Sequence, residues 1–286
     1  MSINHRPILV FGVDGFLGNY FYRAFEENQQ PVIGFGRRTG LPFDLNTDID
    51  ISNITPRPSH ALITAGVTKI AKCQNDPQGS HLINVERTFA LAASLCRMEI
   101  IPVVFSSDYV FDGKDGPFTE KSLPNPLNEY GKQKFALEKL LEENFPGKYL
   151  LFRLPKVYSI DPQKKNLLTE IIEALRQDKS LFAATDQIFN PVDIRDVFEE
   201  IHRKIQENAR GLFNLGGYQR ISRYELCLLI KDELAIKKGE IIPIKLKDLN
   251  ESFTRPANTV IVSEKIDSSK FSDLLKNIQQ IGIHYE

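Results

Sequence analysis

The first half of this 286-residue chain alternates between short apolar runs and longer amphipathic runs. The apolar runs lie at residues 7–12, 31–36, 60–66, 100–107 and 148–154. The amphipathic runs repeat apolar residues at helical spacing and cover approximately residues 16–28, 77–98 and 127–145. Continuous apolar strands separated by amphipathic helices are typical of a parallel sheet with helices on both faces. Right-handed crossovers between such strands predict an α/β fold with a doubly wound parallel sheet.

The composition argues against several classes of protein. A formal net charge of −1, without a basic stripe, argues against a nucleic-acid binder. No run approaches the length of about 18 apolar residues that a membrane-spanning helix needs, and the opening residues do not resemble a secretory signal. The three cysteines form no CxxC motif and the five histidines show no ligand spacing. We therefore expect free thiols, no metal, no membrane partner and a cytoplasmic location.

A glycine-rich turn joins the first predicted strand to the first predicted helix. Gly12, Gly15 and Gly18 in GVDGFLG would let the backbone approach a pyrophosphate, and Phe16 and Leu17 open the helix whose amide groups would face it. The spacing is GxxGxxG rather than GxGxxG, so glycines that only pack the turn are the competing interpretation. The position of the turn in the first strand–helix unit favours binding of a dinucleotide phosphate.

The end of the second predicted strand indicates which dinucleotide is bound. An NAD site usually places Asp or Glu there for the ribose 2′-hydroxyl. This chain instead has Arg37 and Arg38, with no acid until Asp44. Guanidinium groups bind a 2′-phosphate with charge-assisted hydrogen bonds, whereas a carboxylate would repel it. NADP(H) is therefore favoured as the cofactor, with NAD(H) as the alternative and two solvated arginines as the interpretation without a ligand.

Two further short segments are candidates for the cofactor site. Asp44 and Leu45 could line an adenine pocket, although a surface turn explains them nearly as well. Ala65 and Gly66 end the next apolar run with small residues, which would let a cofactor pass close to the backbone. A glycine required only for packing is an equal alternative for that second segment.

The alternation loosens after about residue 156, where shorter runs mix with a polar, turn-rich tail. We therefore expect a dinucleotide-binding Rossmann domain over residues 1–157, to which part of residues 186–210 returns. A smaller mixed α/β lobe that binds the substrate is expected over residues 158–185 and 211–286. Ligands of such sheets bind beyond the carboxyl ends of the strands, so the chemistry is expected there.

Tyr130 and Lys134 lie four residues apart in EYGKQK and would share one face of a helix. A phenol with a pKa of about 10 is a poor acid near neutrality, and a neighbouring ammonium favours the phenolate. The pair could therefore deliver a proton to a carbonyl oxygen while hydride arrives from nicotinamide, and Lys134 could hold the ribose hydroxyls. Ser107 ends the fifth predicted strand and could hold the substrate oxygen, whereas Ser106 would turn to the other side. A chance Tyr–Lys pair and a strand-end turn are the competing interpretations.

The chain resembles the extended short-chain dehydrogenase/reductase superfamily and, within it, the dTDP-4-dehydrorhamnose reductase family. The resemblance runs almost end to end through the segments GVDGFLG, SSDYVFDG, PLNEYGKQK, FRLPKVY, GLFNLGG and RPANTV. It implies a catalytic triad of Ser107, Tyr130 and Lys134, with Ser in place of the family's Thr. It also implies NAD(P)H as hydride donor and a nucleotide-linked 4-keto-6-deoxy sugar as substrate.

The resemblance also suggests residues that bind the substrate. Asp108 and Tyr109 follow Ser107, and Arg255 of the RP element could face the diphosphate. Lys156 stands where the family has an aromatic residue, so the identity of the sugar is open and Lys156 could meet a charged group. Asp14 in the glycine loop is electrostatically awkward beside a pyrophosphate unless it points outward or caps the helix.

Two other functions stay open. The regulatory β subunit of methionine adenosyltransferase resembles the same family and binds NADP, so a non-catalytic regulatory subunit is one alternative. A sugar-nucleotide epimerase or dehydratase is another, although Asp108 is followed by Tyr109 rather than the glutamate of dehydratases. The arginines after the second strand disfavour the tightly held NAD of epimerases. The oligomeric state is open, a homodimer included.

Overall fold

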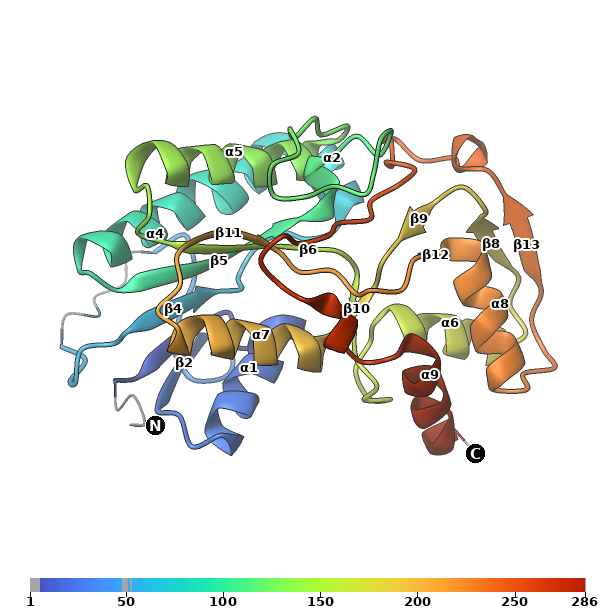
Figure 1. Cartoon of the computed structure of the whole chain (residues 1–286), viewed down its shortest axis with the longest axis horizontal. Coiled ribbons are helices and arrows are strands. Elements are labelled where there is room, and N and C mark those ends of the chain that lie inside the picture. Colours follow the sequence, from blue (N-terminus) through green and yellow to red (C-terminus); the bar gives the residue numbers. More distant parts are fainter. Residues whose placement is uncertain (1–5, 48–50, 52, 286) are drawn as a thin grey trace. The chain divides into compact units, whose positions relative to one another are not determined.

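The computed structural model describes residues 6–47, 51 and 53–285 and divides into two compact units (Figure 1). Unit 1 comprises Met1–Ser107, Asn128–Arg153 and Phe198–Phe213, and unit 2 comprises Asp108–Leu127, Leu154–Val197 and Asn214–Glu286. These boundaries differ from the expected ones because residues 108–127 group with unit 2, and the segment that returns to unit 1 is 198–213. The assignment of the cofactor to unit 1 and of the substrate to unit 2 stays a prediction.

Unit 1 is built on a seven-stranded sheet, which confirms the doubly wound α/β class. The strands, in spatial order, are β11 (Gly211–Asn214), β6 (Leu150–Leu154), β5 (Ile101–Ser107), β4 (His60–Ile63), β1 (Ile8–Phe11), β2 (Val32–Gly36) and β3 (Leu41–Pro42). Strand β1 pairs in parallel with β2 and with β4, so Phe11 lies between Phe35 and Ile63. The chain order turns back at β1, where such sheets open a crevice for a ligand.

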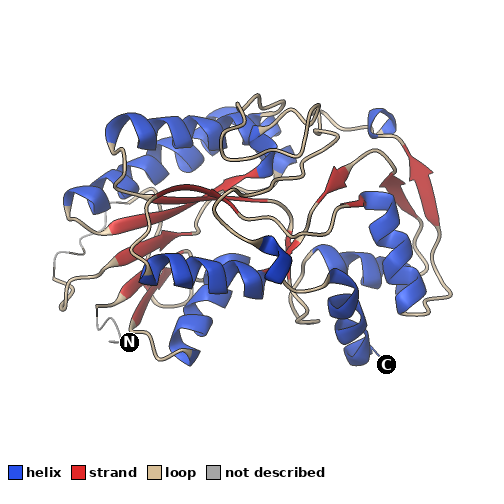
Figure 2. Cartoon of the chain, in the orientation of Figure 1, coloured by secondary structure: helices blue, strands red, loops and turns tan. Residues whose placement is uncertain are grey.

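Helices cover both faces of this sheet (Figures 1 and 2). One face carries α4 (Thr88–Arg97) and α5 (Glu129–Asn144), preceded by α2 (Ile70–Asn75), α3 (Pro77–His81) and a π-helical segment, η1 (Leu82–Arg87). The other face carries α1 (Phe16–Glu27) and α7 (Ile194–Gln206). Helices alternate with parallel strands because each crossover needs a helix to bury the apolar face of the sheet.

Alternation along the strands sends apolar side chains into two cores. Val104 packs with Leu95 and Leu141 in the core under α4 and α5. Phe105, the next residue, turns to the opposite face and stacks on Phe21 of α1, with ring centroids 5.8 Å apart. Full burial of such a side chain stabilises the fold by about 1.5–3 kcal/mol, so strand periodicity determines both layers.

Unit 2 is a mixed α/β assembly with three two-stranded sheets, as expected for the smaller lobe. The sheets pair β7 (Val157–Tyr158) with β10 (Val192–Asp193), β9 (Ile188–Phe189) with β12 (Ile221–Ser222), and β8 (Leu181–Ala184) with β13 (Ile241–Ile244). Its helices are α6 (Leu167–Arg176), α8 (Arg223–Glu233) and α9 (Leu274–Gly282). The short helical turns are η2 (Asp108–Val110), η3 (Leu246–Asp248), η4 (Ser268–Lys270) and η5 (Ile283–Tyr285).

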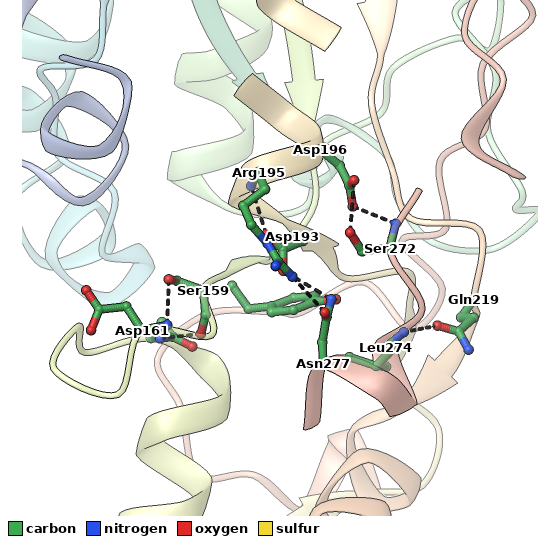
Figure 3. A network of polar contacts seen from close by, with 11 residues as sticks. Ser159, Asp161, Asp193, Arg195, Asp196, Gln219, Ser272, Leu274 and Asn277 are labelled. Carbon is green, nitrogen blue, oxygen red and sulfur yellow. Dashed lines mark hydrogen bonds and ion pairs between the residues drawn. The ribbon is translucent and has the colours of Figure 1, made fainter. Parts of the chain in front are cut away.

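The sequence analysis did not predict helix α9. A buried polar network holds this helix in unit 2 (Figure 3). Asn277 of α9 accepts a hydrogen bond from Arg195 at 2.7 Å and donates to the Tyr158 hydroxyl at 2.8 Å. It also donates to the fully buried Asp193 carboxylate at 3.1 Å, which forms an ion pair with Arg195 at 2.9 Å. Such a network is stable only when its members are all paired, so it fixes the position of α9 within unit 2.

Candidate functional site

The glycine loop of unit 1 has the shape of a phosphate cradle. Gly12 follows β1 with φ +100°, a conformation that favours glycine, and an added Cβ would lie 2.7 Å from the amide nitrogen of Ala65. An added Cβ on Gly18 would lie 2.2 Å from the carbonyl oxygen of Gly12. Gly15 is the N-cap of α1, and no side chain caps that helix end. The amides that open α1 at Phe16 and Leu17 therefore have no side-chain cap, and the cradle fits the pyrophosphate of a dinucleotide.

The two predicted arginines lie just after β2, and both are near carboxylates. Arg37 Nη2 forms an ion pair with Asp44 Oδ2 at 3.0 Å, and Arg38 Nε lies 3.9 Å from Asp14 Oδ1. The arginine side chains are 74% and 81% exposed. Asp14 also accepts the backbone N–H groups of both arginines, so it neither caps α1 nor points into solvent.

The remaining predicted cofactor residues have structural partners in the same unit. Asp44 accepts the backbone N–H of Asn46, and this hydrogen bond together with Arg37 holds the pKa of the Asp44 carboxyl below its ordinary value. Leu45 packs against the core under α4 and α5. Ala65 donates its N–H to the carbonyl of Phe11 and follows β4, so Ala65 and Gly66 lie at the carboxyl end of the sheet.

Tyr130 and Lys134 occupy the first two turns of α5, as the sequence predicts. Asn128 caps this helix by accepting the N–H of Gly131 at 3.0 Å. The Lys134 ammonium lies 5.8 Å from the centroid of the Tyr130 ring and donates to the carbonyl of Phe105 at 2.9 Å. Phe105 is two residues before Ser107, which ends β5, so these contacts tie Lys134 both to the phenol ring and to the backbone near the end of that strand.

Burial lowers the pKa of Lys134 to about 8, although the nearby Cys73 and Glu138 side chains oppose this shift. An ammonium with this pKa exchanges its proton readily near neutrality, which suits a group beside a proton donor. The structure therefore brings Tyr130, Lys134 and the end of β5 together in unit 1.

A buried ion pair supports this arrangement, and the sequence reasoning missed it. Glu138 lies one turn beyond Lys134 on α5 and binds Arg153 of β6 at 2.6 Å, with side chains 9% and 3% exposed. The same carboxylate accepts the hydroxyl of Ser106. Ser106 thus turns toward Glu138 of α5, and its exclusion from the candidate site stays a prediction. The available signal was Glu138 four residues after Lys134, on the same helix face.

A second buried network joins α5 to the segment after β4. Asn84, in the π-helical segment η1, accepts the N–H of Val67 at 2.8 Å and donates to the carbonyl of the same residue at 2.9 Å. Asn84 also donates to Gln133 of α5 at 2.8 Å, and Gln133 donates to the Ser80 hydroxyl. π-Helical turns often occur at functional sites. The network ties the residue next to Lys134 to the loop that carries Ala65 and Gly66.

Four of the five residues predicted to bind the substrate, all except Ser107, lie in unit 2. They are Asp108, Tyr109, Lys156 and Arg255. Arg255 donates to the hydroxyl of Tyr109 at 3.3 Å, and its Nε and Nη2 bind the carboxylate of Glu251 at 2.5 and 2.6 Å. Desolvation holds the pKa of Lys156 below its ordinary value, although the Asp108 carboxylate opposes this shift. The guanidinium predicted to face a diphosphate is therefore already paired with a side chain of its own chain.

The described part of the chain, residues 6–47, 51 and 53–285, holds no cluster of three His, Cys, Asp or Glu side chains that could bind a metal ion. None of the helices in this part is long and apolar enough to cross a membrane. Cys73, Cys96 and Cys227 are free and buried.

The chain is similar to methionine adenosyltransferase 2 beta subunits and to dTDP-4-dehydrorhamnose reductases. It is 27% identical over 257 residues to the methionine adenosyltransferase 2 subunit beta of Bos taurus, covering 85% of this chain and 77% of that protein. It is 28% identical over 241 residues to the dTDP-4-dehydrorhamnose reductase of Salmonella typhimurium, covering 79% and 78%. A dTDP-4-dehydrorhamnose reductase from Bacillus anthracis, solved in complex with NADP, has a TM-score of 0.83 and 20% identity, covering 98% of this chain and 99% of that one.

The model of the RmlD substrate binding domain matches residues 6–280, nearly the whole chain. The segments that carried the sequence resemblance, from the glycine loop to the RP element, all lie inside this match. The chain therefore belongs to the RmlD substrate binding domain family.

Proposed function

We propose that the protein is an NADPH-dependent oxidoreductase that reduces a nucleotide-linked 4-keto-6-deoxy sugar. The observation that carries this proposal is the Lys134 ammonium beside the Tyr130 ring and tied to the Phe105 carbonyl. The glycine cradle that would hold a pyrophosphate lies in the same unit. The Salmonella and Bacillus reductases support this choice of reaction and of cofactor.

Each residue of the triad has a separate role in the proposed reaction. Reduced nicotinamide, when bound, supplies the hydride. Tyr130 donates its phenolic proton to the carbonyl oxygen of the sugar, and the Lys134 ammonium stabilises the negative charge left on the phenol. Ser107 donates a hydrogen bond to the same carbonyl oxygen and orients it. Ser107, Tyr130 and Lys134 thus orient the ketone, supply its proton and stabilise the phenolate that forms.

The substrate residues proposed in unit 2 are Asp108, Tyr109, Lys156 and Arg255. A guanidinium suits a diphosphate because it donates two parallel hydrogen bonds. Since Glu251 already accepts two such bonds from Arg255, a diphosphate would have to displace this carboxylate. We propose that this exchange accompanies the binding of the sugar nucleotide.

A non-catalytic regulatory subunit is the second candidate function. Two observations favour it: the methionine adenosyltransferase β subunits cover up to 94% of this chain at 26% identity, and Arg255 is neutralised by Glu251. In this case the protein would bind the cofactor and a partner protein without turnover. An epimerase, the third candidate, would keep its nicotinamide bound through the cycle.

A substrate panel distinguishes these candidates. The purified protein is mixed with NADPH and a set of dTDP- and UDP-linked 4-keto-6-deoxy sugars, and loss of NADPH absorbance is followed. Turnover with at least one sugar that is lost in Tyr130→Phe, but kept in the matched control Tyr218→Phe on the surface of unit 2, supports the reductase. Binding of NADPH without any turnover would favour the regulatory subunit instead. Release of an epimerised sugar without net NADPH loss would favour the epimerase.

The cellular setting and assembly belong to the same proposal. Three free, buried thiols and a reaction that consumes NADPH fit a cytoplasmic enzyme. We propose a small-molecule sugar nucleotide as the substrate and a homodimer as the assembly to be tested by light scattering.

A further inference from the structure

Asp14 makes an unusual set of contacts for a residue of a phosphate-binding loop. It stands between Gly12 and Gly15, and its carboxylate reaches the end of β2. Oδ2 accepts the backbone N–H of Arg37 at 2.7 Å and that of Arg38 at 3.0 Å. Desolvation alone would raise the pKa of Asp14, but these hydrogen bonds, with one from Thr39, hold it below its ordinary value. The carboxylate is therefore ionised at neutral pH.

The charges at this end of β2 come in balanced pairs. Arg37 has Asp44 as its partner at 3.0 Å, and Arg38 has Asp14 at 3.9 Å. Two guanidinium groups without counter-charges would attract a phosphate strongly. Here two carboxylates accompany the two guanidinium groups, so the net charge of the four side chains is zero. The local positive charge is therefore smaller than the two arginines in the sequence suggest.

The position of Asp14 matters because the second strand of this fold ends beside the ribose of the adenosine. A 2′-phosphate carries about −1.5 to −2 charges at pH 7 and seeks backbone N–H groups and guanidinium groups. Two such N–H groups, those of Arg37 and Arg38, already donate to Asp14. A 2′-hydroxyl carries no charge and can itself donate to a carboxylate.

We propose that Asp14 is a specificity-determining residue that narrows the preference of this protein for NADPH over NADH. Its negative charge repels a 2′-phosphate but tolerates a 2′-hydroxyl, and it occupies the amides that the phosphate would use. The inference rests on the cofactor site of the proposed function and adds the residue that sets cofactor choice.

The test is the substitution Asp14→Asn, which keeps an oxygen acceptor of the same shape and removes the charge. Dissociation constants for NADPH and for NADH are measured by nicotinamide fluorescence without any sugar nucleotide. The ratio of the NADH constant to the NADPH constant is expected to rise about tenfold, which corresponds to about 1.4 kcal/mol. The increase should shrink as salt is raised, because exposed charges are screened.

Asp267→Asn is the matched control. Asp267 also accepts a backbone N–H, from Ser269 at 3.2 Å, and its pKa is also lowered, by hydrogen bonds from Ser269, but it belongs to unit 2. This variant should leave the ratio unchanged. Asp44→Asn, which frees Arg37, should raise the ratio and serves as the second variant if Asp14→Asn does not fold.

The outcomes separate this inference from the proposed function. If both cofactors bind and the ratio stays constant or falls in Asp14→Asn, the role of Asp14 is refuted while the cofactor site stands. If neither cofactor binds to the unmodified protein, the proposed function fails first. Thermal unfolding of each variant, followed by circular dichroism, shows whether the loop has kept its fold.

Discussion

Replacing Glu138 by Gln should destabilise the protein strongly, because the Glu138 carboxylate forms an ion pair with the buried guanidinium of Arg153. The Arg153 guanidinium binds both oxygens of this carboxylate, with Nε at 3.0 Å from Oε1 and Nη2 at 2.6 Å from Oε2. The two side chains are 3% and 9% exposed, so solvent cannot replace the lost charge. Breaking a buried pair by removing one partner costs about 3–5 kcal/mol. This is a large part of the roughly 5–15 kcal/mol by which folded domains are stable.

The assay is urea unfolding followed by far-UV circular dichroism, since the chain contains no tryptophan. Glu143→Gln is the matched control, because Glu143 lies on the same helix, is 60% exposed and is 4.0 Å from Lys139. Its loss should change the free energy of unfolding by no more than about 0.5 kcal/mol. Replacing Glu138 and Arg153 together by methionine should cost less than Glu138→Gln alone, because neither charge of the pair is then left buried without its partner.

Glu138→Gln should also change the pKa of Lys134 in the candidate catalytic site. The Glu138 carboxylate raises the pKa of Lys134, while burial lowers it. Removing the carboxylate should therefore move this pKa further below its ordinary value and shift the pH profile of turnover. If Glu138→Gln lowers the free energy of unfolding by less than about 1 kcal/mol, Glu138 and Arg153 do not form a buried, interdependent pair.

Three further predictions concern unit 1. Tyr130→Phe should lower kcat by about 10²–10⁴-fold with NADPH affinity nearly unchanged, because only the proton donor is lost. Steady-state kinetics and a binding titration measure the two quantities, and an equal loss of kcat and of NADPH affinity would contradict the assignment. Arg37→Ala should weaken the binding of NADPH relative to that of NADH by about fivefold or less, since Asp44 already neutralises this exposed guanidinium. An equal effect on the affinities for both cofactors would mean that Arg37 does not contact the 2′-phosphate. The pKa of Lys134 is lowered from 10.5 to about 8 on folding, so the unfolded chain binds more protons between these values and stability should rise with pH across that window. Lys134→Met should lack this rise, and urea titrations at several pH values that show parallel curves for both proteins would contradict the assignment.

The fold could be predicted because its determinants are local in the sequence. A strand such as Ile8–Phe11 has to be apolar on both faces in a parallel sheet, and a helix such as Phe16–Glu27 has to repeat apolar residues at helical spacing. The glycines of the first turn and the Tyr130–Lys134 pair belong to the same class of signal, because residues four apart on a helix share a face. Helix α9 was the exception: the Asp273 N-cap and the buried Leu274, Ile278 and Ile281 at helical spacing were local signals that the sequence prediction did not use.

The charge state of the candidate sites depends on contacts between residues far apart in the chain. Asp14 reaches Arg37 and Arg38 only because β1 and β2 are neighbours in the sheet. Asn84 meets Gln133 only because η1 packs against α5. The sequence by itself therefore determined the layers, the glycine loop between β1 and α1, and the pairing of a phenol with an ammonium. Only the tertiary structure decided which carboxylates neutralise the arginines and which buried pair supports the lysine, because sheet order, not spacing along the chain, brings those side chains within hydrogen-bonding distance.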